Sequence, residues 1–303
     1  MTPISRLGRI MFTGSIVALV TPFTDEGGID HAALDGLVDF HLEQGSEALV
    51  VAGTTGESPT LTKPEWRDLL TAIVRRVNGA IPVLAGTGSA STEVAVDLTR
   101  QAGALGADGV LVVTPYYNRP TQTGLEAHFT AIAEAAAVPV VLYNVPSRTA
   151  VDLLPATVQR LAAHPRIIGI KEAKSDAGRV AELVARCGSG FIVLSGDDST
   201  SLAAMQEGAT GVVSVAANVA PALMRELCAL AGSQDWAAAE RLDRRLQSLF
   251  DALAVVTNPI PVKWALFEMN RVGPQIRLPL TPLEEAHRSP LRQCLDALGL
   301  LRA

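Results

Sequence analysis

A lysine interrupts the short apolar run Ile-Ile-Gly-Ile-Lys-Glu-Ala at 167–173. The run is typical of a strand buried on both faces, where a lysine rarely occurs unless it is paired or has a chemical role. Apolar neighbours disfavour the ammonium form, so Lys171 would carry a nucleophilic amine suited to forming a Schiff base. The simpler alternative is a lysine that extends from a strand end into solvent. Alternation along the strand places Gly169 and Lys171 on one face, and Ile168 and Ile170 on the other.

The tyrosines of the chain also follow apolar runs. There are three, Tyr116, Tyr117 and Tyr143, and all stand at such ends. An amine and a keto acid form an imine by losing water, so protons must be carried to and from the carbinolamine. Tyr143 is our candidate for the general acid and base of that step. A phenol is a weak acid near neutral pH, and a neighbouring hydroxyl, that of Thr55 or Tyr117, could relay its proton.

Two further sites could bind carboxylates. The turn Gly-Thr-Thr-Gly-Glu-Ser at 53–58 offers the hydroxyl and backbone N–H groups of Thr54 and Thr55. Arg148, after the run that ends at Tyr143, has a planar fork that matches a carboxylate with two hydrogen bonds. The alternatives are that the threonines serve the turn alone and that Arg148 is a surface residue.

Strand-like and helical segments alternate along the first three quarters of the chain. The expected strands lie at 14–19, 48–52, 82–85, 109–113, 139–143, 167–170, 191–194 and 211–215. Helical spacing between them predicts helices at 32–43, 64–77, 92–105, 125–136, 155–163, 176–187 and 200–207. Eight such units predict a (β/α)8 TIM barrel, whose catalytic residues lie at the carboxyl ends of the strands. A doubly wound open sheet is the alternative, although the first strand is not followed by G-x-G-x-x-G.

The pattern changes after the eighth unit. Residues 234–303 show only helical periodicity, which predicts a C-terminal helical region packed on the barrel. We therefore expect a barrel at 11–233 and helices at 234–303. Residues 1–10 would form an N-terminal extension, since they hold arginines and no apolar stretch of a signal peptide.

Composition narrows the class of protein. The chain has 303 residues, a net charge of −6 and no basic run, which argues against a nucleic-acid surface. Its three cysteines have no C-x-x-C spacing and its five histidines no metal-ligand spacing, so we expect no disulfide framework and no metal. No apolar run approaches the length of a membrane span. These features predict a soluble, cytoplasmic protein, and they leave room for a small anionic substrate, because a local Arg or Lys can hold one.

Seven motifs follow one another along the chain: FTGSIVA at 12–18, GTTGES at 53–58, TPYYNRP at 114–120, LYNVPSRT at 142–149, GIKEA at 169–173, LSGDD at 194–198 and NPIPVKWA at 258–265. With them the chain resembles the dihydrodipicolinate synthase family of the pyruvate-dependent class I aldolases, from residue 11 to about residue 301. Several long motifs in order make the resemblance specific.

The resemblance implies a role for each site residue. Lys171 matches the lysine that forms a Schiff base with pyruvate, Tyr143 the proton donor and acceptor, and Thr55 and Tyr117 its relay partners. The pyruvate carboxylate would be held by Thr54 and Thr55. The remaining substrate-binding positions are Gly196, Val213, which is often isoleucine in the family, and Arg148, which matches the residue that receives the carboxylate of aspartate 4-semialdehyde.

The resemblance also implies the reaction and the assembly. Pyruvate and L-aspartate 4-semialdehyde would condense to 4-hydroxy-tetrahydrodipicolinate, in diaminopimelate and lysine biosynthesis, with no cofactor or metal. Tyr117 would be lent across a subunit interface of a homotetramer built from two dimers. The alternatives are another aldolase of the superfamily, such as N-acetylneuraminate lyase, and a catalytically silent pyruvate-binding relative. The Tyr-Tyr pair and Arg148 favour the synthase.

One departure from the family pattern predicts altered regulation. In lysine-inhibited members the end product binds at the dimer interface, and Ser58 and Tyr116 match two residues of that site. Four other positions differ: Lys63 and Trp66 replace histidines, Ala90 replaces an asparagine and Val94 a glutamate. A lysine ligand needs an anionic or carbonyl partner for its ammonium, and Val94 offers only hydrocarbon. We therefore expect weak feedback inhibition by L-lysine, or none.

Overall fold

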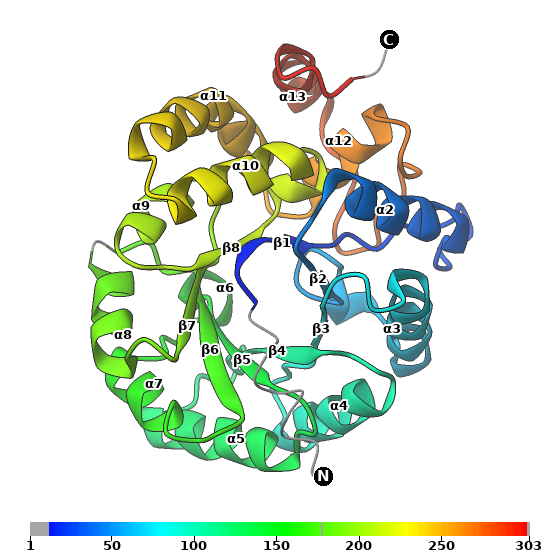
Figure 1. Cartoon of the computed structure of the whole chain (residues 1–303). Helices are drawn as coiled ribbons and strands as arrows, with labels where there is room; N and C mark the ends of the chain where they lie inside the picture. Colours follow the sequence, from blue (N-terminus) through cyan, green and yellow to red (C-terminus); the bar gives the residue numbers. More distant parts are fainter. Residues whose placement is uncertain (1–11, 177, 302–303) are drawn as a thin grey trace.

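The computed structural model describes residues 12–176 and 178–301, so the expected N-terminal extension at 1–10 lies outside it. The strands form a closed parallel barrel in the order β1 to β8, with the helices outside the ring (Figure 1). This confirms the TIM barrel, and each expected strand agrees with the observed one to within two residues. The strands are β1 (Gly14–Ala18), β2 (Ala48–Val51), β3 (Val83–Gly86), β4 (Gly109–Val113), β5 (Val140–Asn144), β6 (Ile167–Glu172), β7 (Ile192–Ser195) and β8 (Gly211–Ser214).

A helix follows every strand and returns the chain to the bottom of the barrel. After β5 a one-turn helix, α6 (Pro146–Thr149), precedes the return helix, and α10 is the eighth helix that the pattern requires. The helices are α2 (His31–Gln44), α3 (Lys63–Val77), α4 (Thr92–Ala104), α5 (Gln122–Ala135), α7 (Pro155–Leu161), α8 (Arg179–Cys187), α9 (Ser201–Gln206) and α10 (Pro221–Gly232).

Apolar side chains on both faces of the strands build two separate cores. One fills the barrel and includes Phe12, Leu84 and Leu194. The other lies between the strands and the helices and includes Val110, Ile170 and Leu183. Because both faces of the strands are buried, the strand sequences are nearly continuous apolar runs.

An irregularity in β6 overturns one detail of the expected alternation. Pairing with β5 shifts register at Val140, so that Val140 faces Ile167 and Val141 faces Gly169. Ile168 packs against the core inside the barrel, whereas Ile170 belongs to the outer core. The prediction that these two isoleucines share a face is therefore wrong, because an extra residue in one strand of a pair shifts the side chains before it.

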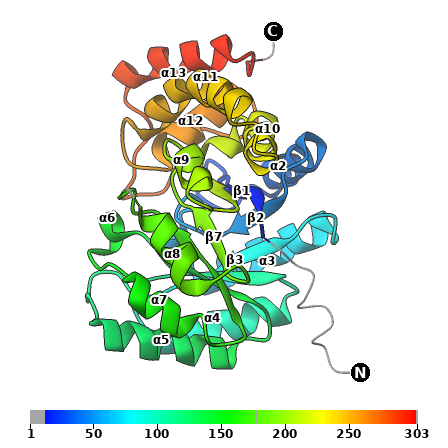
Figure 2. The ribbon, with the colours of Figure 1, turned by 60° about the vertical axis from the view of Figure 1, so that its left-hand side comes forward.

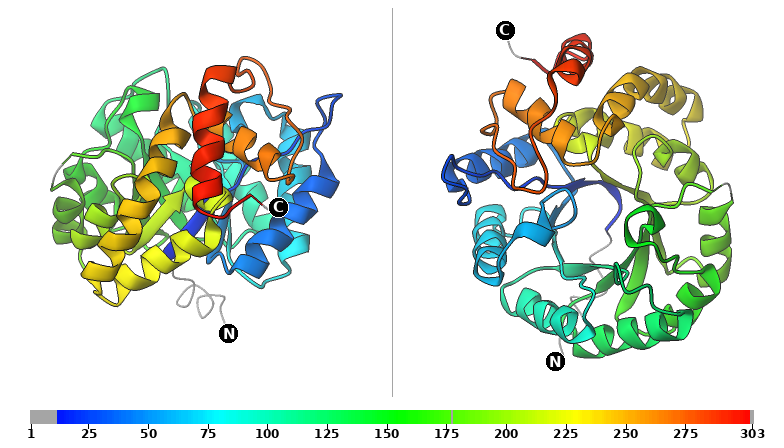
Figure 3. Two further views of the ribbon diagram at one scale, coloured as in Figure 1. Left: turned by 90° about the horizontal axis from the view of Figure 1, so that it is seen from above. Right: turned by 180° about the vertical axis from the view of Figure 1, so that it is seen from behind.

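The last part of the chain adds helices to one side of the barrel. They are α11 (Trp236–Ala254), α12 (Ile260–Glu268) and α13 (Glu285–Ala297). Figure 2 and the left view of Figure 3 show them grouped together, with α13 on the outside. α13 packs against α11 and α12, and α11 packs against α10. The helical region is thus an extension of the barrel's helix layer, and the boundary at residue 234 stays a prediction.

Within the described residues, no helix combines the length and the apolar character needed to cross a membrane.

A buried histidine makes stability depend on pH. His41 of α2 is fully buried, and burial, with a contribution from Arg271, lowers its pKa from 6.5 to about 3. Above pH ~6.5 the imidazole is neutral in both states, whereas below it the unfolded chain takes up a proton that the folded chain does not. Stability is therefore lost as the pH falls from about 6.5 toward 3, and at pH 5 the loss is about 2 kcal/mol.

We expect His41→Leu to remove that loss. The measurement is the free energy of urea unfolding at pH 7 and pH 5, and the variant should lose about 2 kcal/mol less than the wild type between them. Gln44→Leu, at the last residue of the same helix, changes no titratable group, so it is the control and should leave the difference unchanged. If His41→Leu and the wild type lose equal unfolding free energy between pH 7 and pH 5, His41 is not the source of the pH dependence.

Candidate active site

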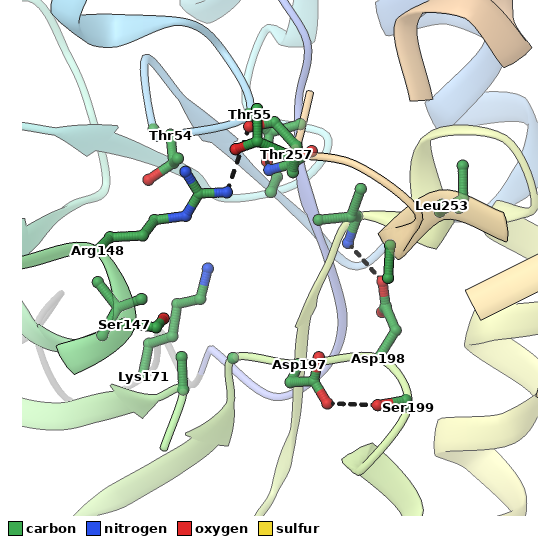
Figure 4. Close-up of a pocket in the computed structure, with 18 of the residues that line it drawn as sticks. Thr54, Thr55, Ser147, Arg148, Lys171, Asp197, Asp198, Ser199, Leu253 and Thr257 are labelled. Carbon is green, nitrogen blue, oxygen red and sulfur yellow. Dashed lines mark hydrogen bonds between the residues drawn. The ribbon is translucent and has the colours of Figure 1, made fainter. Parts of the chain in front are cut away.

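A cavity of about 520 Å³ opens at the carboxyl ends of the strands. Loops after β2, β5, β6 and β7 line it, together with the end of α11 and the segment that follows. The Lys171 side chain projects into it, with its amine directed toward the guanidinium of Arg148 (Figure 4). The structure therefore brings Lys171, Tyr143, Thr54, Thr55, Arg148 and Gly196 to one cavity.

Lys171 and Tyr143 are direct neighbours on adjacent strands. Tyr143 of β5 pairs in register with Lys171 of β6, and the Nζ atom lies 4.2 Å from the centre of the phenol ring. Both residues are only 6% exposed. Lys171 therefore does not extend into solvent, and the amine and the phenol stand close enough to serve the same substrate atoms.

The turn with the two threonines is held from behind by a buried ion pair. Glu57 has a left-handed backbone, with φ of 55°, and its carboxylate accepts from Lys263 of α12 at 2.6 Å. Both side chains are almost inaccessible to solvent, and burial lowers the pKa of Lys263 while Glu57 opposes that shift. Because an unpaired charge would be costly there, the pair fixes the turn against α12.

The backbone of this turn leaves donors available. In the part of the chain that the structure describes, the N–H groups of Thr54 and Thr55 have no acceptor, whereas those of Gly56 and Glu57 donate to carbonyls within the turn. Two free N–H groups at the edge of a cavity can hold an anionic oxygen.

Asn258 is a site residue that the sequence analysis did not single out. Its Nδ2 donates to Oγ1 of Thr55 at 2.9 Å, and its backbone carbonyl accepts from Arg148 at 3.3 Å. It thereby joins the loop after β2 and the loop after β5 to the segment between α11 and α12. The signal was present, because Asn258 begins the motif NPIPVKWA, but nothing in that motif indicates which distant loops it reaches.

The ends of β6 and β7 approach so closely that only glycine fits. A Cβ atom on Gly196 would lie 2.6 Å from the Cβ of Ala173, so a side chain there would displace the loop beside Lys171. Asp198, two residues after this glycine, also lines the cavity and accepts from the N–H groups of Val215 and Ala216, while burial raises its pKa.

Two expected site residues lie away from the cavity lining. Val213 of β8 is buried in the core inside the barrel and is not one of the residues that line the cavity. Tyr117 follows β4, is 95% exposed and does not line the cavity of its own chain. Its backbone is left-handed, with φ of 74°, which is uncommon for a residue with an aromatic side chain.

Among residues 12–176 and 178–301, no group of three or more His, Cys, Asp or Glu side chains could hold a metal ion.

Comparison with known proteins gives consistent results. A family model described as the dihydrodipicolinate synthetase family matches residues 11–298. The 4-hydroxy-tetrahydrodipicolinate synthase of Stutzerimonas stutzeri (strain A1501) is 53% identical over 291 residues, covering 96% of this chain and all of that protein.

Solved structures agree. The chloride-inhibited dihydrodipicolinate synthase of Acinetobacter baumannii, complexed with pyruvate, is 48% identical, with a TM-score of 0.94 over 96% of this chain and 100% of that one. A monomeric dihydrodipicolinate synthase variant is 44% identical, with a TM-score of 0.94 over 96% of this chain and 98% of the other.

Proposed function

This chain belongs to the dihydrodipicolinate synthetase family, and from that premise we propose that it is a 4-hydroxy-tetrahydrodipicolinate synthase. It condenses pyruvate with L-aspartate 4-semialdehyde, and one water leaves overall. The observation that supports this most strongly is the Lys171 amine, buried beside Tyr143 at the centre of the cavity.

The first step joins pyruvate to the enzyme. The unprotonated Nζ of Lys171 attacks the keto carbon, a C–N bond forms and the carbonyl oxygen takes a proton. Loss of that oxygen as water leaves the imine. Tyr143, whose ring lies 4.2 Å from Nζ, supplies and removes the protons. The N–H groups of Thr54 and Thr55 hold the pyruvate carboxylate, since neither has an acceptor among the described residues.

The second step joins the two substrates. The imine loses a methyl proton to become an enamine, whose carbon attacks the aldehyde of the semialdehyde. The amino group of that substrate then attacks the imine carbon, closes the ring and releases Lys171. Arg148 lines the same cavity as Lys171, with its guanidinium near the amine, and binds the second carboxylate, because its fork suits two oxygens (Figure 4).

Tyr117 serves the site of a second copy. An aromatic side chain that is 95% exposed on a left-handed backbone is costly in an isolated chain. The cost is explained if the loop after β4 enters the cavity of another subunit and completes the proton relay of Tyr143 and Thr55. The active assembly is then an oligomer, and we propose a tetramer of two dimers.

Paired assays test the function. The protein is incubated with pyruvate and aspartate semialdehyde and, separately, with N-acetylneuraminate, and product is followed in each. We expect turnover of the first pair alone. Cleavage of N-acetylneuraminate would assign the chain to another aldolase, and absence of both reactions would make it a binding protein.

We expect L-lysine to inhibit weakly or not at all. The cleft beside the Gly-Glu-Ser turn is lined by Trp66 and Val94, and the Trp66 N–H is already bonded to the Gly86 carbonyl at 3.0 Å. The Lys63 amine pairs with Asp97 at 3.2 Å. An ammonium bound here lacks the carboxylate that Val94 replaces, a loss of about 1.5–3 kcal/mol in binding free energy.

The measurement is an inhibition curve for L-lysine at saturating pyruvate. Val94→Glu, which restores an anionic partner at the cleft, is the matched variant and should become more sensitive than the wild type. Half-inhibition of the wild type below about 1 mM, a binding free energy near −4 kcal/mol, would contradict the prediction.

A further inference from the structure

A buried polar cluster lies directly behind the two central residues of the cavity. Asn144 follows Tyr143 in β5 and Glu172 follows Lys171 in β6, and the two pairs are in register. Successive side chains of a strand point to opposite faces, so Tyr143 and Lys171 face the barrel interior while Asn144 and Glu172 face the helix layer. Tyr143 and Lys171 are therefore each followed in the chain by a buried polar residue.

Both polar atoms of the Asn144 side chain make hydrogen bonds. Its Nδ2 donates to Oδ1 of Asp152 at 2.8 Å and to both oxygens of Glu172, at 3.0 and 3.1 Å. Its Oδ1 accepts from the N–H of Leu153 at 2.9 Å. The amide can be placed only one way round, because carboxylates lie on one side of it and an N–H lies on the other. Its position is thus fixed from two directions.

Glu172 is fixed equally well. Its side chain has no exposed surface, and besides Asn144 it accepts from the Lys174 N–H at 2.8 Å and from Nε of Arg179 at 3.0 Å. Burial raises the pKa of this carboxyl and the Arg179 charge opposes that shift. Three donors from three directions leave the carboxylate little freedom.

Arg179 and Asp152 close the cluster. The Nη2 of Arg179 donates to Asp152 and to the Leu153 carbonyl, each at 2.7 Å. The loop before α7, the end of β5, the end of β6 and the start of α8 are therefore joined in one network. A buried ion pair contributes little net stability, because desolvation offsets the attraction between the charges. What such a network does supply is fixed geometry.

We infer that Asn144 and Glu172 are positioning residues that hold Tyr143 and Lys171 at the separation needed for proton transfer at the imine. The inference rests on the proposed function, since it assigns a role within that reaction. Neither residue lines the cavity, and each acts through the backbone of the catalytic residue next to it. A displacement of about 1 Å at the reacting groups can cost about 100-fold in rate.

The test measures proton transfer without the second substrate. In D2O, the enamine formed from pyruvate returns with deuterium, so exchange of the methyl hydrogens can be followed by proton NMR. We expect Asn144→Ala and Glu172→Gln each to slow exchange by about 10- to 100-fold at saturating pyruvate. Glu172→Gln keeps the shape of the side chain. It replaces one accepting oxygen with an NH2 group, which would meet the donors of Asn144, Lys174 and Arg179.

A double-mutant cycle separates positioning from general loss of packing. If the two residues act as one unit, the double variant should exchange about as slowly as the slower single variant. Glu47→Gln is the matched control, because Glu47 accepts from the Ser15 N–H at the opposite end of the barrel. It should leave exchange unchanged and combine additively with Asn144→Ala.

Every outcome of this test is decisive. All variants are assayed below their melting temperatures, so that only folded protein is compared. Exchange within about threefold of the wild type in either single variant, or additive losses in the double variant, would overturn the inference. If the wild type itself fails to exchange pyruvate, the proposed function fails instead. Thermal unfolding is a second readout, and lowered melting temperatures with unchanged exchange would assign the cluster to stability alone.

Discussion

Lys171→Arg is expected to abolish covalent trapping of pyruvate. With the wild type, borohydride should reduce the imine and add the mass of a reduced pyruvyl group to the peptide that holds Lys171. A guanidinium stays protonated and cannot attack a carbonyl carbon, so the variant should show no adduct while keeping a positive charge at the site. Condensation activity should be lost with it.

The structure explains why a single lysine should react. The chain has four, and three are paired with carboxylates: Lys63 with Asp97, Lys174 with Asp152 and Asp176, and Lys263 with Glu57. Across the described parts of the chain, Lys171 alone has no carboxylate partner, and its Nζ faces the Tyr143 ring. Peptide mapping after reduction is the measurement, with Lys63→Arg as the control that should still be labelled. An adduct on another lysine, or none on the wild type, would rule out the mechanism.

Local patterns were enough to predict the barrel. Each strand is a short apolar run followed by a helix, so neighbouring residues in the sequence already specify the unit, and eight units leave few other topologies. The ring then places all strand ends on one face. That is why residues as distant as Thr55 and Lys171 could be assigned to one site before any contact was known.

Long-range packing was not predictable in the same way. Asn258 reaches Thr55 and Arg148 only because α11 and α12 pack against the barrel in one orientation. No local pattern specifies that orientation. The partners of Asn144 and Glu172 were missed for a related reason, since both residues lie in or beside apolar runs and only tertiary structure brings Arg179 to them. The register shift before Gly169 likewise depends on the partner strand.

Arg148→Ala is expected to reduce condensation strongly while leaving the first step intact. Removal of the guanidinium leaves the substrate carboxylate without its charged partner, at a cost of about 2–5 kcal/mol in transition-state binding. That corresponds to a fall in kcat/KM for the semialdehyde of about 30- to 5000-fold. Because the partner of Arg148 is the second substrate, borohydride trapping of pyruvate on Lys171 should survive.

Two variants refine the test of Arg148. Arg148→Lys keeps the charge but not the fork, so it should recover only part of the lost kcat/KM. Arg186→Ala, which removes an exposed arginine paired with Glu182 on α8, is the control for loss of a surface charge and should behave as the wild type. Arg148 also donates to the Asn258 carbonyl, so the alternative role for this residue is to link the two loops. Equal losses of pyruvate trapping and of condensation would show that Arg148 holds the loops together instead of binding the semialdehyde.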